Sequence, residues 1–87
     1  MRTIHKYPLA FDEDNSVVMP TGSRLVLFAI QNGIPHVWAD VITGNQNEVR
    51  RLAIHGTGHP VGTLSRHIGS LQDGPFVWHL YDKDGLA

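Results

Sequence analysis

The pair Asn32-Gly33 lies between two runs of strand-forming residues, Arg24 to Gln31 and Ile34 to Ile42. Asn-Gly in this position favours a type I′ turn, in which both central residues take positive φ, and it is the strongest short-range signal of a β-hairpin. The first run is apolar from Leu25 to Ile30, which predicts a central strand with both faces covered. The fold therefore has to accommodate a hairpin near the middle of the chain.

The rest of the sequence alternates short β-branched or aromatic runs with Gly, Pro, Asn and Asp, which is typical of strands and turns. Further strands are predicted at 2–9, 16–19, 48–55, 68–72 and 76–81. One short helix is predicted at 62–67, capped by Thr63. We therefore expect a single mainly β domain over 1–87, α+β at most: a small antiparallel sheet or partly closed barrel of about six to seven strands with at most one short helix.

Size and composition narrow the classes of function. A domain of 87 residues buries only about 60% of its unfolded surface, and without cysteines it lacks disulfides, so we expect a homo-oligomer, a dimer or tetramer. A formal net charge of −1 argues against a polynucleotide partner. No apolar run is long enough for a membrane span or signal peptide, and the chain is expected to be cytoplasmic. Its six histidines are the compositional outlier.

The segment Gly56-Thr57-Gly58-His59 is the main candidate for ligand binding. Two glycines allow successive backbone N–H groups to converge on a phosphate, while the hydroxyl of Thr57 and the ring of His59 add hydrogen bonds. A tight connection that merely needs positive φ explains the same residues equally well. His55 and His59 have the spacing of a helical zinc motif, but the glycines between them disfavour a helix, so no metal site is predicted.

Aromatic and basic residues on predicted strands are secondary candidates. Trp38 shares a strand face with His36, and an aromatic ring on a polar face can stack on a ligand, although a strand Trp more often packs in a core. Arg51 lies on the same side of its strand as His55 and could supply charge, or it could be a solvated edge residue. His79 is a further possible contact, on the strand face opposite the one that carries Trp78.

In that last strand, Phe76, Trp78 and Leu80 share the face expected to enter the core. The chain lacks a cysteine nucleophile, a Gly-x-Ser-x-Gly elbow, a Walker loop and an evident carboxylate pair in this half, so no catalytic residue and no cofactor is predicted. Asp73 and Asp82 are interpreted as turn or surface carboxylates. These observations argue against an enzyme.

A set of short motifs resembles a family of small phage-encoded proteins of unknown function. The matching segments are Ile4-x-Lys-Tyr-Pro-Leu9, Met19-Pro-x-Gly22, Gln31-Asn-Gly-x-Pro35, Trp38-Ala39, Gly56-Thr-Gly-His59, Ile68-Gly69 and Gly74-Pro-Phe-Val-Trp-His79. Small phage proteins of this kind include anti-defence sponges, which bind cyclic nucleotide immune signals without cleaving them. The resemblance therefore implies a small nucleotide ligand, such as a cyclic dinucleotide.

We accordingly expect a non-enzymatic phage anti-defence protein that sequesters a cyclic nucleotide signal. Gly56, Thr57, Gly58 and His59 would contact phosphate, Arg51 would supply charge, and Trp38 would stack, with His36 and His79 as further contacts. One alternative is a metal-assisted phosphoesterase that uses His55, His59 and His79. Another is an interaction module that inhibits a host or phage partner through the apolar strand from Leu25 to Ile30.

Overall fold

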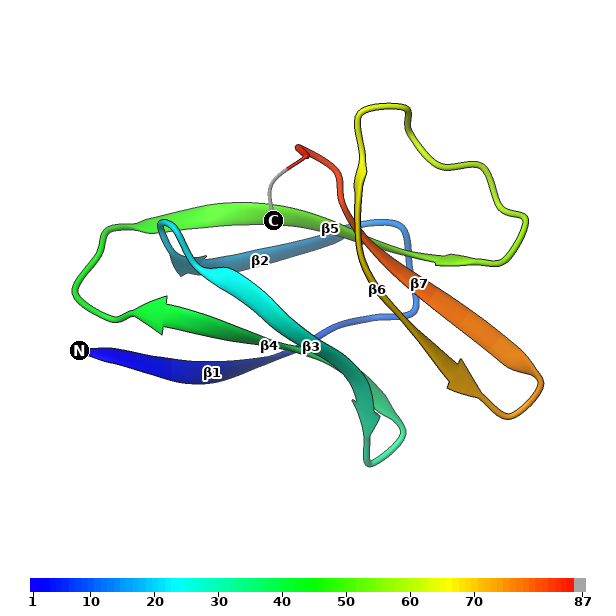
Figure 1. Ribbon diagram of the computed structural model, residues 1–87, viewed down its shortest axis with the longest axis horizontal. Coiled ribbons are helices and arrows are strands. Elements are labelled where there is room, and N and C mark those ends of the chain that lie inside the picture. Colours follow the sequence, from blue (N-terminus) through cyan, green and yellow to red (C-terminus); the bar gives the residue numbers. More distant parts are fainter. Residues whose placement is uncertain (86–87) are drawn as a thin grey trace.

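The computed structural model describes residues 1–85, and the protein is built from strands arranged in two antiparallel sheets (Figure 1). The seven strands are β1 (Arg2–Pro8), β2 (Asn15–Pro20), β3 (Arg24–Gln31), β4 (Ile34–Ile42), β5 (Asn47–Gly56), β6 (Arg66–Asp73) and β7 (Phe76–Asp82). One sheet has three strands in the order β1-β4-β3, and the other has four in the order β2-β5-β7-β6. The predicted mainly β fold is confirmed, and the two sheets are not closed into a barrel.

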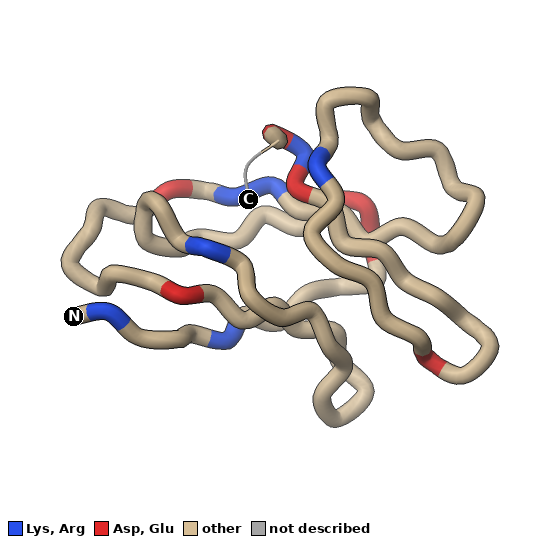
Figure 2. Tube along the Cα trace, viewed as in Figure 1, with Lys and Arg blue, Asp and Glu red and all other residues tan. Residues whose placement is uncertain are grey.

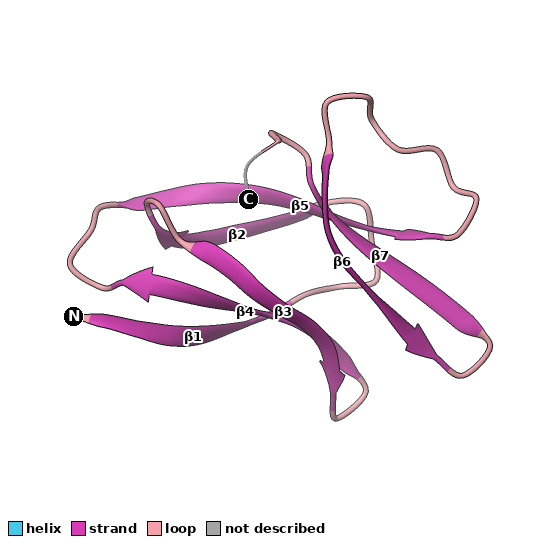
Figure 3. Ribbon diagram, in the orientation of Figure 1, coloured by secondary structure: helices cyan, strands magenta, loops and turns pink. Residues whose placement is uncertain are grey.

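The short helix predicted at 62–67 is wrong. Residues 57–65 form a long loop (Figure 3), in which the backbone N–H of Ser65 donates to the carbonyl of Gly62 in a tight turn. β6 then begins at Arg66, because its residues pair with β7 over the whole hairpin. None of residues 1–85 forms a helix of the length and hydropathy needed to cross a membrane.

The apolar side chains alternate along the strands, and one face of each sheet enters a shared core. In β4 the core residues are Val37, Ala39 and Val41, which are fully or almost fully buried. Leu52 and Ile54 of β5 and Leu80 of β7 belong to the same core and come from the four-stranded sheet. The remaining buried apolar residues of this cluster are Leu9, Val17, Met19 and Phe28.

The central position predicted for the strand Arg24 to Gln31 is also wrong. β3 pairs only with β4 and forms an edge of the three-stranded sheet. A bulge between Leu25 and Leu27 shifts the alternation, so that Leu25 packs against the core while Leu27 is 51% exposed. The strand is apolar on both faces, but only one of them is covered.

The turn between β3 and β4 has the predicted geometry. Asn32 and Gly33 have φ of 54° and 77°, so both central residues of the hairpin lie in the left-handed region that the type I′ turn requires. The predicted hairpin at the end of the chain is also present, with Gly74 at φ 55° between β6 and β7. Both turns follow from short-range sequence.

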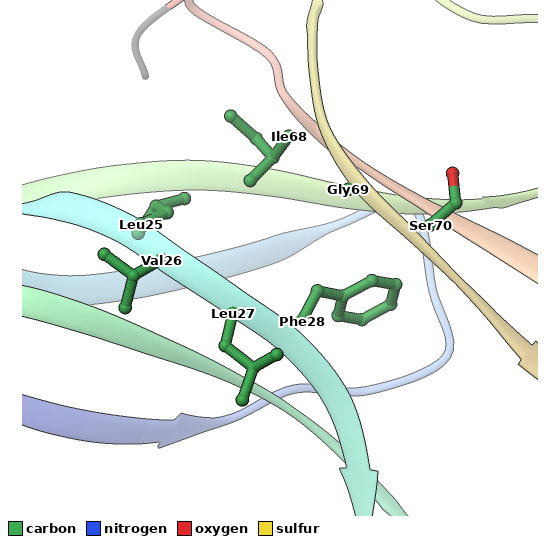
Figure 4. A pocket seen from close by; sticks show the side chains of 7 residues that line it. All are labelled: Leu25, Val26, Leu27, Phe28, Ile68, Gly69 and Ser70. Carbon is green, nitrogen blue, oxygen red and sulfur yellow. The ribbon is translucent and has the colours of Figure 1, made fainter.

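A seam runs between the edge strands β3 and β6. These strands lie side by side but are not hydrogen-bonded partners, and a hollow of about 230 Å³ lies between them (Figure 4). Ile68 of β6 and Leu25 and Phe28 of β3 line it. Gly69 also lies against Phe28, and a Cβ atom at Gly69 would be in ordinary van der Waals contact, at 3.6 Å, with the Cβ of Phe28. The seam separates the sheets on this side.

A buried ion pair joins β5 to β7 within the core region. The Nη2 atom of Arg50 lies 2.9 Å from Oδ2 of Asp82, and both side chains are at most 2% exposed. Nη1 of Arg50 also donates to the carbonyl of Ser23 at 2.9 Å. The interpretation of Asp82 as a surface carboxylate is wrong, because the even-numbered positions near the end of β7 point inward. Its role in a turn is confirmed, because Oδ1 of Asp82 accepts a hydrogen bond from the backbone N–H of Asp84 at 2.9 Å.

Candidate functional site

The loop Gly56–His59 lies at the end of β5, beside the first half of β7. Gly56 is the Cα partner of Trp78, and the loop continues beyond it to Arg66 (Figure 3). The start of β7 and the turn that precedes it therefore flank the loop. This register brings together the two motifs of the second half of the chain, Gly56-Thr-Gly-His59 and Gly74-Pro-Phe-Val-Trp-His79.

Each glycine of the loop has a distinct role. A Cβ atom on Gly56 would lie 3.2 Å from Cε1 of His59, so the imidazole ring folds back over the glycine in a space that a side chain would fill. The backbone N–H of His59 donates to the carbonyl of Gly56 at 3.2 Å and closes this turn. Gly58 has φ of 87° and open space around it, which explains glycine there on conformational grounds. The loop is thus a shaped turn that presents His59 at the surface.

The loop separates two hollows, and Gly56, Thr57 and His59 line both of them. The larger hollow has a volume of about 370 Å³ and is completed by Pro75, Phe76, Val77 and Trp78. The smaller one, about 170 Å³, is completed by His55, Gly58, Val61, His79 and Tyr81. The larger hollow therefore has the rings of Phe76 and Trp78 in its wall, and the smaller one has several histidines and a tyrosine.

The aromatic wall of the larger hollow is a pair of stacked rings. The rings of Phe76 and Trp78 are 5.7 Å apart and inclined by 23°, and the ring of Phe11 also packs against Trp78, at 5.0 Å. Trp78 is partly buried against the core, whereas Phe76 is 56% exposed. The prediction that Phe76 enters the core is wrong, because burial along β7 increases only toward its end at Leu80 and Asp82.

At the smaller hollow, His79 of β7 links the loop to β6 through hydrogen bonds. Oγ1 of Thr57 lies 2.8 Å from Nε2 of His79, and Nδ1 of the same ring lies 2.7 Å from Oγ of Ser70 on β6. Both imidazole nitrogens of His79 therefore have partners, and the ring is held in one orientation. The sequence predicts His79 as a secondary contact, and the structure places it directly beside the loop.

His55 lies behind this pair. It faces His79 across the β5–β7 register, is 6% exposed, and its ring meets Tyr81 edge-on at 5.6 Å. Its Nδ1 is 3.6 Å from a carboxylate oxygen of Glu13, beyond hydrogen-bonding distance. His55 therefore forms part of the floor of the hollow.

Trp38 and His36 lie elsewhere. Both are on β4 in the three-stranded sheet, with ring centroids 5.7 Å apart, and they share the face opposite the core residues Val37 and Ala39. The loop belongs to the four-stranded sheet. The structure thus brings Gly56, Thr57, Gly58, His59 and His79 together but not Trp38 or His36.

Arg51 lies on β5 as predicted, but its side chain pairs away from the hollows. Its guanidinium forms an ion pair with Asp84, just after β7. Hydrogen bonding to Arg51 holds the pKa of the Asp84 carboxyl below its ordinary value and raises the pKa of Arg51. Neither hollow at the loop is lined by Arg51.

Sequence reasoning missed three contributors to this region, namely the aromatic surface of Phe76 and the polar side chains of Ser70 and His67. Strand alternation places Phe76 on the same face as Trp78 and Leu80, so periodicity in the sequence did not indicate its exposure. Ser70 and His67 depend on the register of β6 against β7, which contains a bulge between His67 and Gly69. No periodic pattern in the sequence predicts that bulge.

No group of three or more His, Cys, Asp or Glu side chains within residues 1–85 is arranged to hold a metal ion. Histidine near the loop instead bonds to hydroxyl groups, as His79 does with Thr57 and Ser70. The chemistry available here is hydrogen bonding by hydroxyl, imidazole and backbone groups, next to an aromatic surface.

The fold and the loop define a small protein of two antiparallel β-sheets with a glycine-shaped surface loop between two hollows. The chain belongs to the family described as Domain of unknown function (DUF7352), whose model matches residues 1–86. No curated protein and no solved structure matches the chain. The family assignment agrees with the resemblance to a family of unknown function.

Proposed function

We propose that the protein binds a small phosphorylated aromatic ligand of the nucleotide class at the Gly56–His59 loop. The observation that carries this proposal is the position of the stacked Phe76–Trp78 pair in the same hollow as Thr57 and His59. An aromatic ring stacked on such a surface contributes about 1–3 kcal/mol, and a charge-assisted hydrogen bond contributes about 1.5–3 kcal/mol. A base and a phosphate therefore both have suitable partners in this hollow.

The size of the hollow supports a ligand shared between subunits. Ligand pockets usually enclose about 300–1,000 Å³, so a hollow of about 370 Å³ suits one base with its phosphate. A cyclic dinucleotide has a second base, which a second copy of the chain could cover with its own Phe76–Trp78 pair. This arrangement links the expected homo-oligomer to the expected ligand.

Within this class we favour sequestration of a cyclic nucleotide immune signal by a phage anti-defence protein. A sponge needs stacking rings and phosphate donors but no nucleophile, and the sequence motifs resemble those of small phage proteins. To compete with a sensitive receptor the protein needs an affinity near nanomolar, about −12 kcal/mol. The cytoplasm of a host cell is where such a signal would be met.

The direct test is calorimetry against a panel of cyclic mono- and dinucleotides, followed by heating of the complex and chromatography of the released ligand. We expect submicromolar binding of at least one cyclic nucleotide and recovery of that compound intact. A matched pair of variants locates the site: His59→Ala should weaken binding at least about tenfold, whereas Trp38→Leu should not. An absence of binding at micromolar ligand contradicts the proposal, and a product that grows with time favours the phosphoesterase alternative.

A second candidate function is an interaction module, on a different surface from the loop. Ile4, Leu27, Ile34 and Ile42 are each about half exposed and lie around Trp38 on the outer face of the three-stranded sheet. Leu27→Glu would place a charge in this face without touching the loop. A change of oligomeric state or loss of a partner protein in this variant, with nucleotide binding intact, would support the module.

A further inference from the structure

The outer face of β7 and β6 carries a continuous chain of hydrogen bonds that starts at the loop. Thr57 Oγ1 lies 2.8 Å from His79 Nε2, and His79 Nδ1 lies 2.7 Å from Ser70 Oγ. Ser70 Oγ lies 2.9 Å from Nε2 of His67. Four side chains from the loop and two strands are therefore joined end to end, from the wall of both hollows to the far edge of the sheet.

The donors and acceptors in this chain restrict one another. A neutral imidazole has one donor and one acceptor nitrogen, and a hydroxyl has one hydrogen to donate. If Thr57 donates its hydrogen to a neutral His79, the other nitrogen of His79 must carry a hydrogen and donate to Ser70. Thr57 then has no hydrogen left for a ligand.

A bound anion reverses this direction. When the hydroxyl of Thr57 donates to an anionic oxygen, Nε2 of His79 has to be the donor to Thr57. A neutral His79 then accepts the hydrogen of Ser70 at Nδ1, which obliges Nε2 of His67 to donate to Ser70. Both imidazoles then carry hydrogen at Nε2 and remain neutral.

We propose that Ser70 and His67 are positioning residues of the anion site, which act through His79 to turn the hydroxyl of Thr57 toward the ligand and so couple anion binding to the tautomers of the two histidines. This inference rests on the proposed binding of a phosphorylated ligand at the loop. It assigns a role to Ser70 and His67, which line neither hollow at the loop. It also implies that a bound anion favours the tautomers of His79 and His67 that carry hydrogen at Nε2.

Other titratable and charged groups face the two histidines. From β7 the ring of Tyr81 is 5.3 Å from that of His67, and the rings of His67 and His79 are 6.3 Å apart. From β5 the ring of His55 contacts Tyr81, and a carboxylate oxygen of Glu13 lies 3.6 Å from Nδ1 of His55. Arg66 precedes His67 on β6. A test at a single pH therefore keeps the charges of these groups constant.

The test is NMR of ¹⁵N-labelled histidine rings in the full chain, recorded at one mildly alkaline pH with and without sodium sulfate. Sulfate is a tetrahedral dianion whose own charge is constant over these conditions. In the wild type, sulfate should move hydrogen from Nδ1 to Nε2 of His79 and increase the share of His67 that carries hydrogen at Nε2. In Ser70→Ala, sulfate should still change the tautomer of His79 but leave that of His67 unchanged.

Two further variants complete the design. Thr57→Val keeps the shape of the side chain but removes the hydroxyl, and it should abolish the response of His67 to sulfate. Ser16→Ala is the matched control, because Ser16 is an exposed serine on β2 in the same sheet, and it should behave as wild type. Both serines are exposed, so neither substitution threatens the fold.

The outcomes separate the two proposals. Amide shifts of Thr57, Gly58 and His59 report anion binding independently of the histidine rings. If these amides respond while His67 does not, or if His67 responds equally in Ser70→Ala, the coupling is overturned and the binding site remains. If the amides do not respond at all, both the proposed anion site and the proposed coupling are contradicted.

Discussion

The two sheets share one core but differ in where they place their ion pairs. The three-stranded sheet places Arg2 and Asp40 in an ion pair at the surface, on an outer face that mixes apolar and charged side chains around Trp38. The four-stranded sheet buries Arg50 and Asp82 between strands and carries the hydrogen-bonded chain from Thr57 to His67 on its outer face. The buried ion pair and the hydrogen-bonded chain therefore belong to the second sheet, while the first pairs its charges at the surface.

The three-stranded sheet also differs from the rest of the protein in its charge. The three-stranded sheet has three cations, Arg2, Lys6 and Arg24, against one carboxylate, Asp40, although the whole chain has a formal net charge of −1 (Figure 2). The acidic residues are found mainly in the rest of the protein, including the loop Asp12–Asp14. A partner for the outer face of the three-stranded sheet should therefore combine apolar side chains with carboxylates.

The largest expected contrast between the sheets is in their ion pairs. Asp82→Ala leaves Arg50 buried without its main carboxylate, and breaking a buried pair in this way costs about 3–5 kcal/mol of unfolding free energy. Asp40→Ala removes a pair at the surface and should have a far smaller effect. Urea denaturation of both variants measures the difference. Equal losses would show that burial does not distinguish the two pairs.

The second contrast concerns the aromatic surfaces. Phe76→Leu removes an exposed ring from the hollow at the loop and should cost about 1–3 kcal/mol of nucleotide binding, roughly 5- to 150-fold in affinity. Trp38→Leu removes a ring from the other sheet and should leave the affinity unchanged. Calorimetry with the best ligand of the panel compares the two. A loss in Trp38→Leu alone would move the site to the three-stranded sheet.

The third contrast is between the two hairpin turns. Gly33 and Gly74 have φ of 77° and 55°, and a Cβ atom at either would have no other atom within 4 Å. Alanine at either position should therefore cost roughly 1–2 kcal/mol through the backbone conformation alone. Gly44 has equally open space without positive φ, and Gly44→Ala is the control.

Thermal unfolding should show similar losses for Gly33→Ala and Gly74→Ala and almost none for Gly44→Ala. Only Gly74→Ala, next to Pro75 and Phe76 of the larger hollow, should also weaken nucleotide binding. Weaker binding in Gly33→Ala as well would show that the first sheet takes part in the site.

The smallest expected effect is a loss of folding stability at acidic pH. Hydrogen bonds to Arg2, Lys83 and Arg51 lower the pKa values of Asp40, Asp14 and Asp84 in the folded protein. A carboxyl whose folded pKa is depressed stabilises the fold above its unfolded pKa of about 4, and this contribution is lost as pH falls through the folded pKa. We expect a shallow loss of stability below about pH 4, measured by urea denaturation across this range. Asp40→Asn and Asp84→Asn should each flatten it, and an unchanged slope in both would contradict this origin.

Local sequence was enough to predict most strands and turns. β3 and β4 have the predicted bounds, and the turn at Asn32-Gly33 has the predicted positive φ values. The helix expected at 62–67 was wrong. Thr63 can cap a helix, but Arg66 and His67 belong to β6 and pair with β7 instead. The loop at Gly56 was predicted as a candidate site from its glycines, and most of its neighbours were not.

The amino-acid sequence alone determines which segments form strands, most of their alternating faces and the glycine-shaped turns. These features depend on residues close together in the chain. Packing in three dimensions makes β3 an edge, buries Arg50 rather than Arg51, and sets Phe76 and Trp78 rather than Trp38 beside the loop. Those outcomes depend on which strands become neighbours and on where bulges shift their register. Both are set by contacts between segments far apart in sequence.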